Sequence, residues 1–126
     1  MNMEKVFKFA DKFEGSYFNP YKNQTIGLSG IINVSINKDE ENENSMNFIK
    51  TLIDNFDHCI VLPDDHPIAE NIKKFSERFI LTNHEVEDSS IYLDILLDKL
   101  PDTIKSNLIE LEIIDNNIRF IYKIKK

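Results

Sequence analysis

The sequence has 126 residues, of which 41% are hydrophobic, and its formal net charge is −7 at pH 7. This length predicts a single domain spanning residues 1–126, and the hydrophobic content excludes a disordered chain. The acidic balance argues against nucleic acid as a partner, because phosphate binding requires clustered Lys and Arg. No apolar run approaches the roughly 18–20 residues that a membrane span requires, and the first residues lack the pattern of a signal peptide. The single cysteine, Cys59, excludes an internal disulfide framework, and together these features predict a cytoplasmic protein.

Apolar residues alternate with polar ones in two stretches of the first third of the chain. Residues 4–13 alternate around Val and Phe side chains, and residues 25–37 alternate more regularly. Because successive side chains of a strand point to opposite faces, both stretches predict β-strands. Residues 15–23 contain an Asn-Pro pair and several polar side chains, so they predict the loop between these strands.

A helix is predicted in the middle of the chain, after a charged connector at residues 38–44. Ser45 is a favourable cap residue, because its hydroxyl can accept a hydrogen bond from an early backbone N–H. Apolar residues then recur at the spacing of one helix face. They are Ile49, Leu52, Ile53 and Phe56. The stripe ends before Asp57-His58, and residues 62–65 break the chain.

The chain between this break and Pro101 predicts a short helix, an extended piece and a longer helix. Residues 66–67 open the short helix, and residues 79–81 form the extended piece. Residues 88–90 are Asp-Ser-Ser and offer caps for the longer helix, whose Leu side chains at positions 93–100 lie on one face. Pro101 follows that helix, where the chain can no longer continue it.

The last quarter of the chain predicts a β-hairpin. Residues 108–114 and 118–124 form its strands, and residues 115–117 are Asp-Asn-Asn, which tolerate left-handed turn conformations. The element order is therefore strand, strand, helix, helix, strand, strand. That order predicts an α+β fold, in which a four-stranded antiparallel sheet carries two main helices on one face.

Two short motifs lie at the ends of these elements. Residues 56–58 read F-D-H at the end of the first long helix, and residues 113–118 read I-I-D-N-N-I at the hairpin. They are similar to the L-D-H and E-T-D-N-N-I segments of the 6-pyruvoyl-tetrahydropterin synthase family, which includes 6-carboxytetrahydropterin synthase. The order and spacing of further pieces, between about residues 6 and 122, resemble that family too. The resemblance implies its tunnelling fold.

The family holds a zinc ion with three histidines, and those positions carry other residues in this chain. The family's H-G-H step reads Ile26-Gly27-Leu28, and Lys12 stands near the position of the first ligand. Ile and Leu have no atom that binds a metal, whereas a catalytic zinc needs three protein ligands and an open position. We therefore expect no zinc and no other cofactor. The histidines of this chain lie outside the ligand positions, at His58, His66 and His84.

Two further family positions have also lost their residues. The family's reactive cysteine falls near residues 21–22, which are Tyr-Lys, and we interpret Cys59 as a buried structural cysteine. The glutamate that anchors the pterin ring in the family falls at Ile113. Glu112 is one position away and would face the opposite side of the strand, so it could substitute only through a bulge or a register slip. Glu112 and Glu110 are the candidate ligand-binding residues.

Asp57 and His58 match a pair that the family uses for catalysis, in which the histidine shuttles a proton and the carboxylate orients it. They are the candidate catalytic residues of this chain. In a structural interpretation, Asp57 binds the following loop and His58 packs beneath it. We favour the structural interpretation, because the metal, the thiol and the anchoring glutamate are all missing, which would make the pair a vestige.

Three functions remain open from the sequence. The first is a divergent family member without zinc-dependent catalysis, which binds a pterin- or purine-like ligand or assembles with an active paralogue. The second is a metal-independent pterin-pathway enzyme, a carbon–oxygen lyase acting on dihydroneopterin triphosphate or a related pterin. It would use His58 as base and Glu110 or Glu112 for binding. The third is an unrelated α+β interaction domain.

A homo-oligomer is also expected, either a trimer or a hexamer made of two stacked trimers. A small sheet with exposed edges pairs readily with other chains, and closing it into a barrel with neighbouring copies removes those edges. The family resemblance implies the same assembly.

Overall fold

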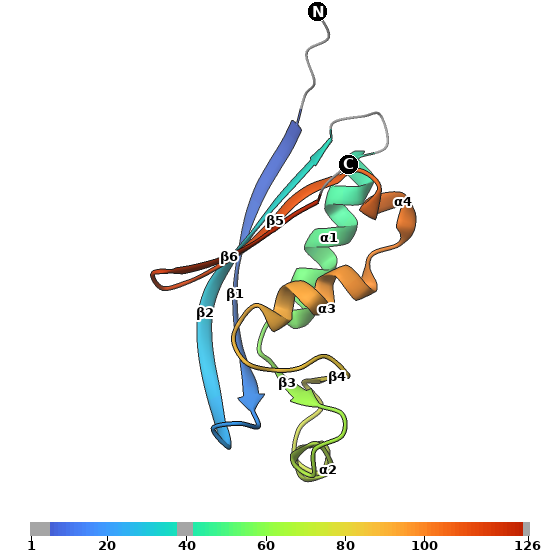
Figure 1. Ribbon diagram of the computed structural model, residues 1–126. Coiled ribbons are helices and arrows are strands. Elements are labelled where there is room, and N and C mark those ends of the chain that lie inside the picture. The colour runs from blue at the N-terminus through green and yellow to red at the C-terminus, as the bar shows by residue number, and fades with distance from the viewer. Residues whose placement is uncertain (1–5, 38–41, 125–126) are drawn as a thin grey trace, which may run out of the picture.

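The computed structural model describes residues 6–37 and 42–124. Figure 1 shows how the strands and helices of this part of the chain are arranged. In chain order the elements are β1 (Val6–Asn19), β2 (Gln24–Asn37), α1 (Asn42–Phe56), β3 (Cys59–Pro63), α2 (Ile68–Lys73), β4 (Phe79–Thr82), α3 (Ile91–Lys99), α4 (Asp102–Lys105), β5 (Leu108–Asp115) and β6 (Ile118–Lys123).

The strands form one six-stranded sheet in the order β4-β3-β1-β2-β5-β6. The pairs β1–β2, β2–β5 and β5–β6 are antiparallel, whereas β1–β3 and β3–β4 are parallel. The predicted α+β class is confirmed, and the predicted four-stranded antiparallel sheet is wrong. Strand β3 escaped prediction because its five residues are almost all buried and show no alternation, as is typical of parallel strands.

The first two strands are longer than predicted. Strand β1 continues to Asn19 and pairs with β2 over its full 14 residues, so most of the loop predicted at residues 15–23 is strand. The connection is a tight turn, because Oδ1 of Asn19 accepts hydrogen bonds from the backbone N–H groups of Tyr21 at 2.9 Å and Lys22 at 3.2 Å. Asn23 completes the turn in the left-handed region, with φ 50°.

Helix α1 begins at Asn42, so Ser45 lies inside the helix and the predicted cap is wrong. Of the charged connector, residues 38–41 lie outside the described residues. The predicted apolar stripe is confirmed, since Ile49, Ile53 and Phe56 are buried in the core.

The second half of the chain follows the prediction with one addition and one difference. Strands β5 and β6 form the predicted hairpin, and Asn116 adopts the left-handed conformation, with φ 56°. The predicted side-chain cap of α3 is wrong, because Ser90 at the N-cap position makes no side-chain cap hydrogen bond, and the Asp88 carboxylate accepts the N–H of Ser90 at 2.9 Å. The unpredicted helix α4 starts directly after Pro101, because proline is tolerated at the beginning of a helix.

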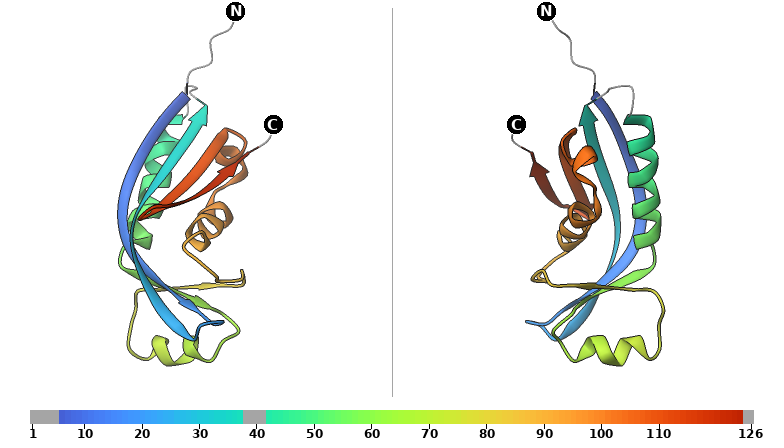
Figure 2. Two further views of the ribbon diagram at one scale, coloured as in Figure 1. Left: turned by 60° about the vertical axis from the view of Figure 1, so that its left-hand side comes forward. Right: turned by 90° about the vertical axis from the view of Figure 1, so that its right-hand side faces the viewer.

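The two main helices cover one face of the sheet, as predicted. Side chains of β1, β2 and β5 that point to this face form the core with α1 and α3. Figure 2 shows from two sides how these helices lie against the sheet. Helix α2 packs on the other face at one end. There Phe18 and Leu62 contact Ala69, whereas their neighbours Tyr17 and Val61 point into the main core. The rest of this second face, which we call the open face, carries the residues of β1, β2 and β5 that alternate with the core residues.

None of the helices in the described part of the chain is long and apolar enough to cross a membrane.

Candidate functional site

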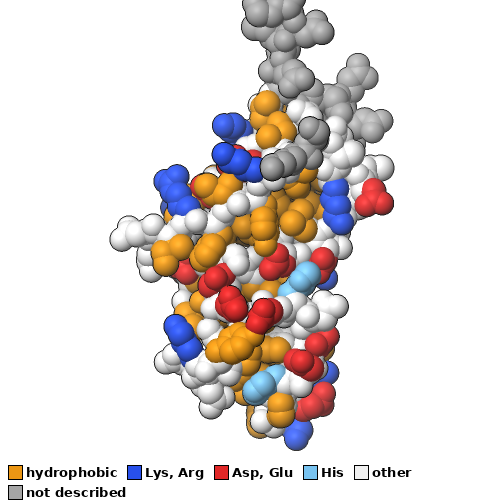
Figure 3. Space-filling model, in the orientation of Figure 1, with side chains coloured by type: hydrophobic (Ala, Val, Ile, Leu, Met, Phe, Trp, Pro, Cys, Tyr) orange, Lys and Arg blue, Asp and Glu red, His pale blue; other side chains and the backbone are white. Residues whose placement is uncertain are grey.

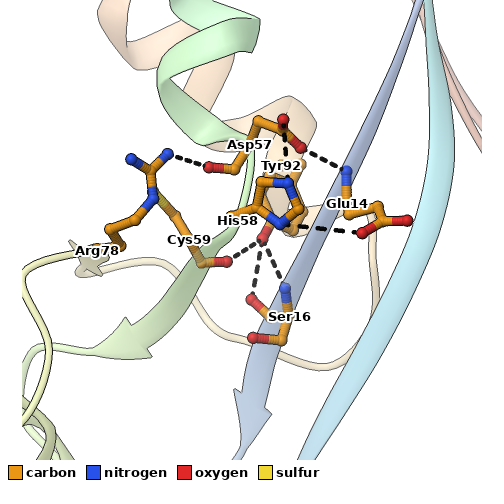
Figure 4. A network of polar contacts seen from close by, with 7 residues as sticks. All are labelled: Glu14, Ser16, Asp57, His58, Cys59, Arg78 and Tyr92. Carbon is orange, nitrogen blue, oxygen red and sulfur yellow. Dashed lines mark hydrogen bonds and ion pairs between the residues drawn. The ribbon is translucent and has the colours of Figure 1, made fainter.

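The candidate catalytic pair lies at the junction between α1 and β3, beside β1 (Figure 4). His58 adopts a left-handed backbone conformation, with φ 58°, which ends the helix. This conformation costs a residue other than glycine about 1 kcal/mol. The His58 N–H compensates by donating to the carbonyl oxygen of Glu14 at 2.6 Å. The backbone of the pair is therefore fixed to β1.

The Asp57 side chain binds the backbone of β1. Its Oδ1 accepts the N–H of Glu14 at 2.8 Å. This side-chain bond joins β1 to the chain just before the first residue of β3. Its carbonyl oxygen accepts a hydrogen bond from Arg78, which satisfies a group at the end of α1. These two contacts support a structural role for Asp57, although it binds β1 and not the following loop.

The His58 imidazole lies between two carboxylates. Its Nε2 is 3.5 Å from Oδ2 of Asp57, and its Nδ1 is 3.9 Å from Oε2 of Glu14. The His58 side chain is 62% exposed, so it does not pack beneath the following loop as the structural interpretation expected. A pocket of about 260 Å³ opens beside it, and Gly15 and Ser16 line that pocket together with Glu14. Sequence reasoning missed Glu14, because only the parallel pairing of β1 with β3 brings it to His58.

Tyr92 of α3 supports this junction from the core. Its hydroxyl accepts the N–H of Ser16 at 3.1 Å and lies within donor distance of two carbonyl oxygens, those of Ser16 at 2.9 Å and Cys59 at 3.0 Å. Burial raises the pKa of Tyr92 well above its usual range, so the hydroxyl stays protonated and can donate. A Cβ at Gly15 would lie 2.2 Å from this hydroxyl, which explains why the position requires glycine.

The thiol of Cys59 lies next to the pair but is held away from solvent. It donates to the carbonyl oxygen of Asn55 at 3.2 Å, and the residue is 7% exposed. Burial raises the pKa of the Cys59 thiol, and the nearby Arg78 only partly opposes this effect. A buried thiol with a raised pKa is a poor nucleophile, which agrees with a structural cysteine.

The family's zinc positions do not form a metal site in this fold. Ile26 and Leu28 point into the core, whereas Lys12 pairs with Ile31 on the open face. Nowhere in residues 6–37 and 42–124 do three or more His, Cys, Asp or Glu side chains form a group that could hold a metal ion. The other two histidines lie in separate places. Nδ1 of His66 accepts the N–H of Ile68, and the His84 ring contacts Asp98 of α3.

The candidate ligand-binding residues Glu110 and Glu112 lie on the open face. Glu112 is only 9% exposed, whereas the adjacent Ile113 points into the core, so no bulge or slip moves Glu112 to the family's position. Nδ2 of Asn33 donates to Oε1 of Glu112 at 2.7 Å, and Nη1 of Arg119 lies 3.8 Å from Oε2.

A pocket of about 340 Å³ lies over these two glutamates. Lys8 of β1 and Glu110 of β5 stand at opposite sides of Ser35, and neither has an ion-pair partner among the described residues. The pocket therefore combines a nearly buried carboxylate, an amide, a hydroxyl, a free ammonium group and a free carboxylate. The residues that line it are Lys8, Phe9, Ala10, Asn33, Val34, Ser35, Glu110 and Glu112.

The structure does not bring the two sets of candidate residues together. One pocket reaches Ala10 of β1, and the other begins at Glu14 of the same strand. At about 3.3 Å per residue, these positions lie ~13 Å apart along the strand. A small molecule held by Glu112 therefore does not reach His58 of the same chain.

Comparisons with known proteins identify the fold. No protein-family model matches the chain, and no curated protein matches it. Among solved structures, 6-pyruvoyl tetrahydropterin synthase from Caenorhabditis elegans aligns with a TM-score of 0.61 and 13% identity, covering 98% of this chain and 97% of that one. An uncharacterized protein from Wolinella succinogenes aligns with a TM-score of 0.54 and 14% identity, covering 96% of this chain and 99% of that one. The chain thus shares the fold of 6-pyruvoyl tetrahydropterin synthase, as the two sequence motifs predicted.

Proposed function

We propose that this chain is a divergent 6-pyruvoyl-tetrahydropterin synthase-like protein that works without zinc and binds a pterin- or purine-like ligand through Glu112. One observation carries the proposal. A nearly buried carboxylate faces a pocket on the open face of the sheet, opposite the face that α1 and α3 cover. A carboxylate is rarely buried unless it is paired or bound to donors, and the only close partners of Glu112 in the described residues are Asn33 and the mostly exposed Arg119.

The chemistry of Glu112 suits the edge of such a heterocycle. An ionised carboxylate only accepts hydrogen bonds and has about four lone-pair sites, so the bond from Asn33 leaves capacity on both oxygens. The pyrimidine edge of pterins and guanine presents two adjacent N–H donors, which match a carboxylate in a bidentate arrangement. Arg119 can move aside, because its side chain is 65% exposed and its Nη1 lies 3.8 Å from the Glu112 carboxylate, near the upper limit for an ion pair.

The protein is proposed to work without zinc because apolar residues occupy the family's ligand positions. Leu28 is part of the hydrophobic core, and Ile26 packs against it. Replacing them by histidine would bury polar groups in the core. Elemental analysis of the purified protein should therefore give far less than one zinc per chain, and a value near one would contradict the proposal.

Ligand binding is tested with neopterin and guanosine as probes, by calorimetry or by the change in pterin fluorescence. We expect Glu112→Gln to weaken binding about tenfold or more, since hydrogen bonds to charged groups contribute about 1.5–3 kcal/mol. Glu110→Gln should have a smaller effect, because Glu110 is less buried than Glu112. Glu77→Gln is the matched control, because Glu77 lies outside both pockets in an exposed segment. Equal binding by wild type and Glu112→Gln, or no binding of either probe by wild type, would contradict the proposal.

A metal-independent lyase acting on dihydroneopterin triphosphate is the second candidate function. One observation favours it, namely that the His58 imidazole is exposed and lies near a carboxylate at each nitrogen. Two observations favour the first candidate, because Asp57 is engaged with the backbone of β1 and the Glu112 pocket lies too far from His58. The third possibility, an accidental resemblance, is disfavoured by a shared fold over nearly the whole chain.

We also propose that the protein assembles into a trimer or a hexamer through the edges of its sheet. Among the described strands β6 pairs with β5 alone, and its Ile118 and Ile121 are 58% and 46% exposed. The pairing of β1 with β3 covers residues 15–17 of β1, so the described part of β1 before them has no strand partner on that side. Pairing of such edges with other copies would cover backbone groups that otherwise face water. Analytical ultracentrifugation at micromolar concentration tests this assembly, and a monomer would contradict it.

A further inference from the structure

Helix α3 makes hydrogen bonds at both edges of the sheet. At one edge, the hydroxyl of Tyr122 in β6 donates to Oδ1 of Asp94 at 2.5 Å. At the other edge, His84 lies two residues beyond the end of β4, and its Nε2 is 2.5 Å from Oδ2 of Asp98. Asp94 and Asp98 project from the same side of the helix, because residues four apart are neighbours on its surface. Figure 3 shows acidic side chains gathered across the middle of this face of the molecule.

The other side of α3 is fixed in the centre of the molecule. Leu93 and Leu96 are fully buried, and the hydroxyl of Tyr92 bonds to the backbone where β1 meets β3. Figure 1 shows α3 lying across the sheet between the region of β4 and the region of β5. Asp94 and Asp98 are therefore held at fixed positions relative to the central strands.

Each edge strand pairs with one neighbour among the described strands. In β6 all side chains except Phe120 are exposed. Strand β4 has four residues, of which Phe79 and Ile80 are half-buried against the core clusters and Thr82 is buried. Edge segments with exposed backbone hydrogen bonds open more easily than central strands, so the loss of one side-chain hydrogen bond has a measurable effect there.

We propose that α3 acts as a clasp that fixes the positions of the two edge strands. Asp94 holds β6 through Tyr122, and Asp98 holds the end of β4 through His84. We call these four residues the α3 clasp. Because both carboxylates stand on one anchored helix, the clasp holds both edge strands at fixed positions relative to the central strands. Breaking either bond loosens the edge strand that it holds and leaves the other strands of the sheet unchanged.

Amide hydrogen exchange of the full chain, followed residue by residue, tests the α3 clasp. In Tyr122→Phe we expect the amides of β6 to exchange about three- to tenfold faster, while those of β4 keep their wild-type rates. In His84→Ala we expect the reverse, with faster exchange in β4 and no change in β6. Asp98→Ala should reproduce the pattern of His84→Ala, because it removes the other partner of the same bond.

Tyr21→Phe is the matched control, because its ring is 66% exposed and its phenol has no hydrogen-bond partner among the described residues. It should leave both edges unchanged. Unchanged exchange at both edges in Tyr122→Phe and His84→Ala would overturn the proposal. Exchange that rises equally in β1, β2 and the edges would overturn it as well, since the bonds would then act on global stability alone.

Discussion

The hydroxyl of Tyr92 offers the sharpest test of how the junction between β1 and β3 is built. The change Tyr92→Phe keeps the ring, which packs against Phe13 and Phe56 with centroid distances of 4.9 and 6.2 Å, and removes only the oxygen. The N–H of Ser16 then loses the Tyr92 oxygen as its acceptor, and the carbonyl of Cys59 loses the Tyr92 hydroxyl as its donor. The Tyr92 side chain is fully buried in wild type, so water does not readily replace its hydroxyl. The variant therefore isolates the hydrogen bonds from the packing.

The expected loss of stability follows from these bonds. Each neutral hydrogen bond contributes about 1 kcal/mol net, and a buried donor left without a partner costs about 1–3 kcal/mol. The hydroxyl has one proton, so it makes one accepted bond and one donated bond at a time. We expect Tyr92→Phe to lower the free energy of unfolding by about 2–3 kcal/mol, measured by urea denaturation with circular dichroism.

Two comparisons make this measurement decisive. Tyr21→Phe removes an exposed hydroxyl and should change stability by less than about 0.5 kcal/mol. Gly15→Ala places a Cβ 2.2 Å from the Tyr92 hydroxyl, so its cost should be smaller in the Tyr92→Phe background than in wild type. A loss below about 1 kcal/mol for Tyr92→Phe, or purely additive effects in the double variant, would refute the reasoning.

The remaining predictions concern His58, Tyr122 and Cys59. We expect neither wild type nor His58→Ala to turn over dihydroneopterin triphosphate, whereas turnover by wild type that disappears in the variant would show a working acid–base group. The hydrogen bond to Asp94, burial and nearby negative charge raise the pKa of Tyr122 from 10.0 to about 12. Because the pKa of Tyr122 is higher in the folded than in the unfolded protein, its hydrogen bond stabilises the protein fully below pH 10, and this stabilisation is lost as the pH rises towards 12. A tyrosinate absorbance titration tests this, since one phenol should ionise at lower pH in Asp94→Asn than in wild type. The Cys59 thiol should react with a thiol reagent only as fast as the protein opens, and rapid reaction under native conditions would contradict its burial.

The elements that could be predicted from the sequence are those with a clear period. The stripe of α1, the Leu-rich face of α3 and the hairpin around Asn116 all have local signals. Each lies where it was predicted, except that α3 ends at Lys99 and Leu100 follows it in an extended conformation. Strand β3 has no such signal, because a short strand that is buried on both faces shows no alternation. Its parallel pairing with β1 depends on residues 43 apart, such as Glu14 and Asp57, so the sequence alone could not show it.

The candidate site was predictable only in part for the same reason. Alternation along β5 correctly placed Glu112 and Ile113 on opposite faces. The burial of Glu112 depends on Asn33, which lies on another strand, and no local pattern connects the two residues. The contact of Glu14 with His58 likewise arises from the fold, whereas the Asp57-His58 motif was visible because its residues are adjacent.

The bond between Asn33 and Glu112 also has a consequence for folding kinetics. These residues are 79 positions apart, and their bond lies where β2 of the first hairpin joins β5 of the second. Each hairpin can form from neighbouring residues, whereas the joint between them requires closure of a long loop, which is the slow kind of step. The Glu112 pocket comes into existence only when that joint closes. A ligand bound there would consequently slow unfolding and leave the folding rate almost unchanged, unless the joint is already formed in the transition state.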